Sequence, residues 1–479
     1  MANTVRTRFA PSPTGSMHIG NLRTALYAYL YAKSNKGVFI LRIEDTDRAR
    51  YVDGATQLIY DTLKSAGLKW DEGPDVGGKY GPYIQSERKS SYLRYAEELV
   101  HAGKAYYCFC SKERLSTLKN DDGISFYDGC CRGLAKDHVI ENIKNGIPGV
   151  IRQKMPKTGT AWYNDLVYGT VEIENRELED QVLIKSDGLP TYNFANVIDD
   201  HLMDITHIIR GNEYLVSTPK YNLLYEAFGW KAPEYIHLPR IMLSKTESFS
   251  KRSGSMSYGD MLNEGFLPQA IINYIALLGW SPGTTRELFS LKELEGCFDI
   301  GHINRSPAIF DRNKLLWMNG EYLRMMDKEE FYETVKPYLE KCIVKELDLH
   351  SVSSLLQKRV TVLSEISDMV DFFNEVSEYD KNIYVNKKMK TDLEVSLASL
   401  RLIYERLSVQ EDFSNDALFA SLSELASKNG MKNSQILWPL RTSVTGRETS
   451  PGGATEIASI LGKQETLRRV SDAVALLDR

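Results

Sequence analysis

Residues 5–21, with the sequence VRTRFAPSPTGSMHIGN, decide how this chain folds. The stretch from Val5 to Ala10 predicts a β-strand, and the prolines and glycines after it predict a loop. A helix is expected next, because apolar residues recur at the spacing of one helical face: Leu22, Ala25, Leu26, Tyr29 and Leu30. The run from Val38 to Ile43 is apolar except for Arg42, which is typical of a strand buried on both faces of a parallel sheet. The chain therefore opens as a β-loop-α-β unit.

This alternation of strands and helices is interrupted between about residues 86 and 191. Inside the interruption, after one helix, the pattern indicates short strands at 150–153, 166–174 and 181–185. Largely apolar runs typical of parallel strands then return at 206–209 and 235–238, with a helix between them. From residue 305 to 479 the pattern is helical. The sequence thus predicts a doubly wound α/β sheet that is split by an insertion and followed by an all-α region.

Composition places the chain among soluble globular proteins. Of 479 residues 42% are apolar, and 59 Lys and Arg face 64 Asp and Glu, so the net charge of −5 gives no global attraction to nucleic acid. Any polyanion must be held by local patches. No apolar run reaches the roughly 20 residues of a membrane span, and no secretory signal opens the chain, so we expect a cytoplasmic protein without membrane contact.

Two loops have the composition of phosphate-binding segments. In the first, Gly15 and Gly20 allow close approach of backbone to a ligand, and His18 stands at a helix start whose free N–H groups attract phosphate. In the second, Lys251 and Arg252 lie in a polar loop and can act as a clamp on triphosphate. A proline-rich turn with a capping histidine and a solvated basic turn are the plain alternatives. The pairing of the two loops on one split sheet favours the phosphate interpretation.

The full set of motifs closely resembles the bacterial glutamyl-tRNA synthetase family, which belongs to the class I aminoacyl-tRNA synthetases. The resemblance rests on these stretches: Pro11–Gly15 with His18–Asn21, Arg42–Asp47, Gly73–Asp75, Gln85–Arg88, Ser186–Tyr192, Asn196–His201, Ser217–Pro219, Ser250–Arg252 and Leu316–Gly320. It covers nearly the whole chain.

The resemblance implies a domain plan and a set of partners. A Rossmann-like catalytic domain is expected at 1–85 and 192–244, with an α+β insertion at 86–191 that binds the tRNA acceptor stem. A connecting region at 245–325 carries the KMSKS-type loop, and an α-helical anticodon-binding domain occupies 326–479. The expected reaction joins L-glutamate to the 2′-hydroxyl of tRNA(Glu) at the cost of ATP, with Mg²⁺, in a monomeric enzyme.

By the same resemblance, each loop has a catalytic role. His18 and the backbone of Gly20 in the HIGH-type loop contact ATP, while Lys251, with Arg252, stabilises the charged transition state of the phosphoryl group. Two departures from the family pattern stand out. Ser248 replaces the first lysine of the KMSKS-type loop, which puts the rate in question, and Asn21 replaces the final histidine of the HIGH-type motif.

Glutamate brings two carboxylates and one ammonium group, so its pocket needs cationic or polar clamps and one acidic partner. Arg8 and Arg210 match the family's carboxylate-binding arginines, and Glu44 matches its ammonium partner. Ser12, Tyr192 and Asn196 match the polar lining. Surface ion pairs are the plain alternative for both arginines.

The insertion contains a cluster of cysteines. Cys108 and Cys110, followed by Tyr127, Cys130 and Cys131, offer enough soft ligands for a tetrahedral zinc ion. The family pattern implies Cys108, Cys110, Tyr127 and Cys131 as ligands, with Cys130 as an alternative fourth; reduced thiols without metal are the other interpretation.

Three further questions stay open at this stage. Arg359 resembles the family's reader of the third anticodon base, or is a solvated helix charge. The enzyme is expected to charge tRNA(Glu) alone or tRNA(Gln) as well. A tRNA-binding paralogue without catalysis is the alternative from another class, which the intact His18, Lys251, Arg8 and Glu44 argue against.

Overall fold

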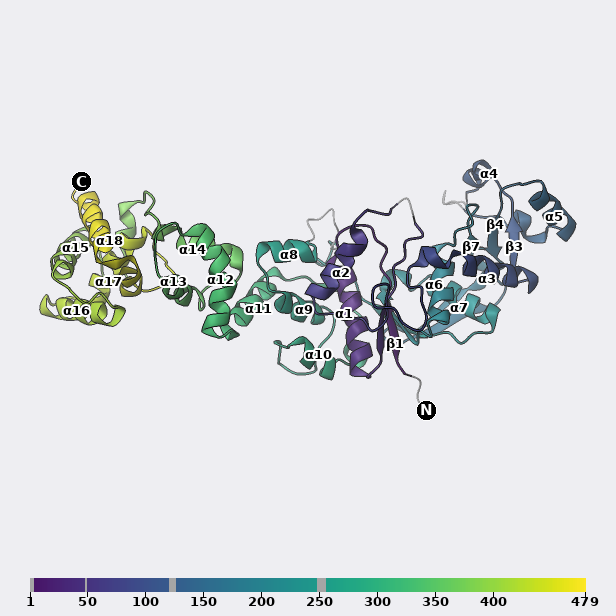
Figure 1. Ribbon diagram of the computed structural model, residues 1–479, viewed down its shortest axis with the longest axis horizontal. Helices are drawn as coiled ribbons and strands as arrows, with labels where there is room; N and C mark the ends of the chain where they lie inside the picture. Colours follow the sequence, from purple (N-terminus) through teal and green to yellow (C-terminus); the bar gives the residue numbers. More distant parts are fainter. Residues whose placement is uncertain (1–3, 48–49, 120–125, 248–255) are drawn as a thin grey trace. The chain divides into compact units, whose positions relative to one another are not determined.

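The computed structural model describes residues 4–47, 50–119, 126–247 and 256–479 (Figure 1). The chain divides into two compact units, Met1–Leu262 with Pro268–Arg312 and Asn263–Leu267 with Asn313–Arg479. Each unit is described by itself. The four-part domain division remains a prediction.

The first unit opens with the predicted β-loop-α-β arrangement. Strands β1 (Arg6–Phe9) and β2 (Val38–Leu41) pair in parallel, and helix α1 (Ile19–Ser34) connects them. The turn back from the helix depends on Gly37, where a Cβ atom would clash with the carbonyl oxygen of Val5. The backbone N–H of Val38 donates to that same oxygen at 2.8 Å, so the absence of a side chain lets the strand enter the sheet.

The second half of the sheet lies on the other side of β1. Strands β8 (His207–Gly211) and β9 (Glu234–Leu238) pair in parallel, with α7 (Thr218–Phe228) between them in sequence. The N–H of Thr206 donates to the carbonyl oxygen of Arg6 at 2.9 Å, which places the start of β8 beside β1. The strand order therefore changes direction at β1, and the crevice at the carboxyl ends of β1 and β8 is the switch point where doubly wound sheets bind ligands.

Inside the insertion, the structure shows one small sheet and one hairpin. Strands β3 (Ala105–Cys108), β4 (Val150–Gln153) and β7 (Val182–Ile184) form an antiparallel sheet, with α3 (Lys89–His101) before it and α4 (Lys112–Thr117) and α5 (Lys136–Lys144) beyond β3 in sequence. The hairpin consists of β5 (Thr160–Asp165) and β6 (Gly169–Glu174).

The hairpin differs from the predicted single strand at 166–174. Its first strand carries Asp165 at an inward position, and this buried carboxylate hides the strand pattern from a reading based on apolar residues. Asp165 Oδ1 accepts from the N–H groups of Val167 and Tyr168 at 2.9 and 2.8 Å, which makes the turn that delays β6 until Gly169. Asp165 also pairs with Tyr235, so β5 extends the sheet of β8 and β9.

The remaining helices and strands described in the first unit are mostly helices, with two short strands among them. They are α2 (Ala55–Ser65), α6 (Tyr192–Leu202), β10 (Ile241–Met242), α8 (Tyr258–Glu264), α9 (Pro268–Ala276), α10 (Leu291–Cys297) and β11 (Ala308–Ile309). Helix α6 leads the chain out of the insertion and into the second half of the sheet, because it ends just before β8.

The second unit is all-α among its described residues, as the sequence predicts. Its helices are α11 (Arg312–Met325), α12 (Lys328–Cys342), α13 (Leu349–Leu356), α14 (Ile366–Val370), α15 (Leu393–Ser408), α16 (Asn415–Lys428), α17 (Asn433–Thr445) and α18 (Ala454–Leu477). Aspartates cap several of them; for example, Asp327 accepts from the N–H of Glu330 at 2.8 Å. Among the described residues, no helix combines the length and apolarity that crossing a bilayer requires.

Candidate active site

A cavity of about 210 Å³ opens at the carboxyl ends of β1 and β8. It lies at the switch point of the sheet, and its walls come from β1, the loop after it, the start of α1, the segment after β2, the start of α6 and the segment after β8. Five of the residues predicted to bind glutamate line it: Arg8, Ser12, Glu44, Tyr192 and Arg210. Burial raises the pKa of the Tyr192 hydroxyl well above its usual value, so this group stays protonated and able to donate.

The sixth predicted residue, Asn196, lies one turn further along α6. It is buried, its side-chain amide donates to the carbonyl oxygen of Tyr192 at 2.8 Å, and it is not among the described residues that line the cavity. Its position supports the helical turn that presents Tyr192. Whether it contacts the ligand stays a prediction.

Arg8 is held by a carboxylate from a distant part of the chain. Its Nε and Nη2 donate to the two oxygens of Asp200 at 3.0 and 3.2 Å, and Asp200 Oδ1 also accepts from Arg42 Nη1 at 2.8 Å. Burial alone would raise the pKa of Asp200, but Arg8 and Arg42 together hold it below its usual value. Asp200 therefore stays ionised and fixes both arginines.

Glu44 offers one oxygen to the cavity. Arg42 donates to its Oε1 from Nη2 at 2.9 Å and from Nε at 3.3 Å, while the buried Oε2 has no hydrogen-bond partner among the described residues. Burial raises the pKa of Glu44, and Arg42 opposes the shift. A buried carboxylate oxygen without a donor is costly unless a ligand supplies one, and an ammonium group is the strongest such donor.

Arg210 offers the complementary atom. Its Nε donates to His237 Nε2 at 3.1 Å and its Nη2 donates to Thr218 Oγ1 at 2.6 Å. Its buried Nη1 has no acceptor among the described residues. Both partners are neutral groups, and no carboxylate of the described chain lies within 4.0 Å of this guanidinium. An anionic ligand would complete its hydrogen bonds and balance its charge.

Among the guanidinium and carboxylate groups that contact one another at the cavity, positive charges outnumber negative charges by one; the next buried carboxylate, Asp165, reaches Arg210 only through His237. Three arginines face two carboxylates: Arg8, Arg42 and Arg210 against Glu44 and Asp200. The neighbouring Arg88 and Asp199 pair with each other at 2.7 Å and add nothing, and Glu213, which also lines the cavity, is exposed to water. Free glutamate carries one net negative charge at neutral pH. Its carboxylate therefore suits Arg210, the one arginine of this group that no carboxylate of the described chain contacts.

Sequence reasoning missed three of the polar lining residues, Thr24, Glu213 and Tyr214. Thr24 lies one turn after Gly20 on α1 and donates to its carbonyl oxygen at 3.1 Å. Tyr214 follows the end of β8 by three residues, and its ring lies 5.0 Å from the Arg210 guanidinium. Their positions, Tyr214 just after a parallel strand and Thr24 on the second turn of the helix that follows one, are the signal that could have found them.

The histidine of the first loop caps helix α1. His18 Nδ1 accepts from the N–H of Gly20 at 3.1 Å, so in the neutral ring the proton sits on Nε2. The backbone of His18 pairs with that of Ser257, and the N–H of Tyr258 donates to the carbonyl oxygen of Met17 at 3.4 Å. The chain that follows the second loop thus returns to the first. Ser248, Lys251 and Arg252 themselves lie outside the described residues.

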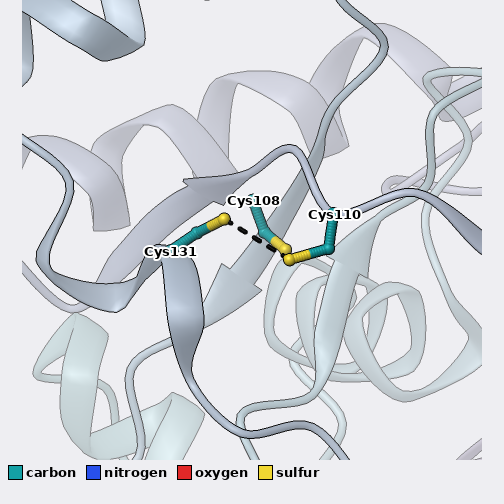
Figure 2. Close-up of side chains that lie close together, drawn as sticks. All are labelled: Cys108, Cys110 and Cys131. Atoms are coloured by element: carbon teal, nitrogen blue, oxygen red, sulfur yellow. Dashed lines mark hydrogen bonds between the residues drawn. The ribbon is translucent and has the colours of Figure 1, made fainter. Parts of the chain in front are cut away.

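Three cysteines of the insertion meet, as Figure 2 shows. The sulfurs of Cys108, Cys110 and Cys131 all lie within 4.8 Å of one another, and those of Cys110 and Cys131 are 3.6 Å apart. The Tyr127 hydroxyl accepts from the N–H of Cys131 at 3.0 Å, whereas Cys130 is exposed. Burial and the neighbouring thiols raise the pKa of Cys110 to about 12, so this thiol stays protonated at neutral pH unless a cation binds beside it.

Arg359, the predicted anticodon reader, has a second arginine beside it. It is exposed after α13, and burial together with the positive charge of Arg359 lowers the pKa of Arg441 on α17. The Arg441 guanidinium lies 4.5 Å from the centre of the Trp438 ring, and its buried Nε has no acceptor among the described residues. Sequence reasoning missed Arg441; its spacing of three from Trp438 on one helix was the available signal.

Comparison with known proteins agrees with this geometry. Residues 4–317 match the family described as tRNA synthetases class I (E and Q), catalytic domain, and residues 330–474 match the anticodon binding domain. The chain therefore belongs to the class I tRNA synthetases of the glutamate and glutamine group, which confirms the predicted fold class.

Its curated relatives are more specific. The chain is 55% identical to the glutamate–tRNA ligase of Clostridium novyi, with 98% of this chain and 97% of that protein covered. It is 54% identical to the glutamate–tRNA ligase of Clostridium tetani, with 99% and 98% covered. A crystal structure of a glutamate tRNA ligase from Elizabethkingia meningosepticum in complex with its amino acid superposes with a TM-score of 0.90 at 36% identity, covering 99% of this chain and 100% of that one. These matches confirm the resemblance seen in the motifs.

Replacement of Arg210 by glutamine tests the cavity. We expect the Michaelis constant for glutamate to rise roughly 10- to 100-fold, because a hydrogen bond to a charged group contributes about 1.5–3 kcal/mol. The constant for ATP should stay within about twofold, since Arg210 acts on the amino acid. Arg286→Gln, which breaks an exposed pair with Glu293, is the matched control. An unchanged constant for glutamate in Arg210→Gln would remove this residue from the pocket.

Proposed function

We propose that this chain activates L-glutamate with ATP and transfers the glutamyl group to tRNA(Glu). One observation carries the proposal: the cavity at the switch point holds a buried acceptor, Glu44 Oε2, and a buried donor, Arg210 Nη1, that the described chain leaves without partners. An amino acid with an additional carboxylate supplies groups for both. The names of the curated relatives, glutamate–tRNA ligases, support the same reaction.

The residues of the cavity bind and orient the amino acid. Glu44 accepts from the ammonium group, and Arg210 donates to one carboxylate. The other carboxylate meets the donors that remain on Arg8, with Ser12 and the Tyr192 hydroxyl completing the polar lining. Because Asp200 and Arg42 hold Arg8 and Glu44 in place, the ligand groups meet fixed partners and little reorganisation accompanies binding.

Activation forms one bond and breaks another at the α-phosphorus of ATP. A glutamate carboxylate oxygen attacks, the glutamyl-adenylate forms and pyrophosphate leaves. His18 and the backbone of Gly20 are placed at the start of α1, where free N–H groups favour phosphate oxygens. We assign Lys251 and Arg252 to the charge that develops in this step. The return of the chain to His18 at Ser257 supports that assignment.

Transfer then forms a carboxylic ester on RNA as the bond between the glutamyl carbonyl carbon and the AMP phosphate breaks. The 2′-hydroxyl of the terminal adenosine attacks the glutamyl carbonyl carbon and loses its proton, and AMP departs. Magnesium enters with the triphosphate, where it would spread the negative charge of the phosphates. The buried carboxylates of the cavity, Glu44 and Asp200, are committed to arginines, so they do not form a dedicated cage for the ion.

The cysteine cluster suits a structural zinc ion. Cys108, Cys110 and Cys131 are close enough to share one ion, and Tyr127 lies beside Cys131 as the fourth ligand, with Cys130 as the alternative. Such a site, closed by protein ligands, would tie the end of β3 to the turn at Cys130–Gly133 and so stabilise the insertion. It would supply no chemistry to the reaction.

In the second unit, we propose that Arg359 and Arg441 meet the anticodon. Burial and the positive charge of Arg359 disfavour the charged form of Arg441, which a polyanionic partner would stabilise, and the Trp438 ring lies beneath Arg441 on the same helix. This arrangement supports binding of tRNA through the α-helical domain.

Zinc content tests the cluster. We expect about one zinc per chain in the purified protein and loss of most of it in Cys131→Ser, with a lower thermal unfolding temperature. Tyr127→Phe and Cys130→Ser identify the fourth ligand, since only one of them should reduce the zinc content. Cys297→Ser, far along the chain in α10, is the control. If the wild-type protein contains no zinc, the cluster consists of reduced thiols and the zinc proposal is wrong.

Charging of purified tRNAs tests the reaction itself. We expect glutamate, ATP and tRNA(Glu) to give glutamyl-tRNA, and Arg359→Gln to lower the efficiency of charging without changing the Michaelis constant for glutamate, because the anticodon and the amino acid bind different units. The same assay with tRNA(Gln) shows whether the enzyme is discriminating. Binding of tRNA(Glu) without any charging would contradict the proposal and favour a non-catalytic paralogue.

A further inference from the structure

The buried arginines of the cavity have partners of two kinds. Arg8 and Arg42 bind carboxylates, so the protein itself balances their charge. Arg210 binds an imidazole and a hydroxyl, which are neutral. The difference decides what each guanidinium can offer a ligand, because a cation already paired with a carboxylate attracts a second one far less.

The imidazole of His237, which binds Arg210 through Nε2, is itself bound by Asp165 through its other nitrogen. His237 Nδ1 lies 2.6 Å from Asp165 Oδ2, and the same oxygen accepts from the backbone N–H of His237 at 3.1 Å. Both side chains are fully buried. Asp165 comes from β5 and His237 from β9, the two strands that pair at Asp165 and Tyr235.

This geometry selects one protonation state of His237. Burial lowers the pKa of the imidazole to about 4, so it is neutral at pH 7. The only proton of the neutral ring sits on Nδ1, where it is donated to Asp165. Nε2 is then an acceptor, which matches the donor Nε of Arg210 at 3.1 Å.

The rest of the Arg210 side chain is held in the same manner. Thr218 Oγ1 accepts from Nη2 and in turn donates to the carbonyl oxygen of Tyr214 at 2.7 Å. The rings of Tyr214, Tyr221 and Tyr235 surround the guanidinium at 4.8 to 5.5 Å. Its orientation is thereby fixed without direct contact to any anion of the described chain, and Nη1 is left for the ligand.

We infer that Asp165 and His237 are positioning residues for the amino acid: they fix Arg210 through a neutral acceptor and so reserve its full charge for a carboxylate of the substrate. A carboxylate at the place of His237 would orient the guanidinium equally well but would neutralise it. The inference rests on the proposed function, because it assumes that the cavity receives glutamate.

Two substitutions of His237 separate the acceptor from the rest of the side chain. His237→Gln places an amide oxygen near the position of Nε2, so it can still accept from Arg210. His237→Asn places its amide near Nδ1, so it can still donate to Asp165 but offers Arg210 no acceptor. Both variants are neutral and similar in size. Steady-state charging of tRNA(Glu) gives the Michaelis constants for glutamate and ATP in each.

We expect His237→Asn to raise the constant for glutamate roughly 10-fold, the effect of losing one hydrogen bond to a charged group, and His237→Gln to stay within about threefold of the wild type. The constant for ATP should change in neither. His201→Gln, whose ring stacks on Trp230 outside the cavity, is the control. Equal constants for glutamate in the Asn and Gln variants, or equal rises for glutamate and ATP, would overturn the inference.

A second pair keeps the test decisive if the His237 variants fold poorly. Thr218→Ser keeps the hydroxyl that accepts from Arg210 and Thr218→Val removes it, so only the valine variant should raise the constant for glutamate. No difference between them would mean that the hydrogen bonds that orient Arg210 do not set the affinity for glutamate, and this would overturn the inference. A wild-type protein that charges no glutamate would instead defeat the proposed function, which distinguishes the two failures.

Discussion

Charge balance at the carboxyl ends of β1, β2 and β8 is the constraint on which the structure of this enzyme depends. Three arginines are buried there, and a buried cation without a partner costs several kcal/mol. Asp200 binds Arg8 and Arg42 at once, and Arg42 also forms an ion pair with Glu44. The network is complete except for Glu44 Oε2 and Arg210 Nη1, and these two atoms define what the cavity can hold.

Much of this site follows from the sequence, because parallel strands bring their carboxyl ends to one edge. Arg8 and Arg210 lie near the ends of β1 and β8, and Glu44 follows β2, so the strand pattern alone predicts that they meet. The partners that hold them could not be predicted. Asp200 lies 192 residues from Arg8, and only the packing of α6 against the sheet decides that its carboxylate reaches two arginines.

Contacts between residues far apart in sequence also explain why the strand β5 in the insertion was not predicted. From the sequence alone, Asp165 in β5 predicts a turn, because an aspartate is rarely buried without a partner. Its partner is His237 on β9, 72 residues away in sequence. The hairpin belongs to the insertion in sequence but extends the catalytic sheet in space. Asp165 of β5 therefore joins the inserted segment to His237 on β9, and through His237 the insertion contributes to the position of Arg210.

The most direct test of this account is a crystal structure of the protein with L-glutamate bound. The account predicts the ammonium nitrogen within about 2.7–3.1 Å of Glu44 Oε2 and a carboxylate oxygen at a similar distance from Arg210 Nη1, with the Arg8–Asp200 and Arg42–Glu44 pairs unchanged. A bound glutamate whose carboxylates both avoid Arg210, or a ligand that displaces Arg42 from Glu44, would contradict it.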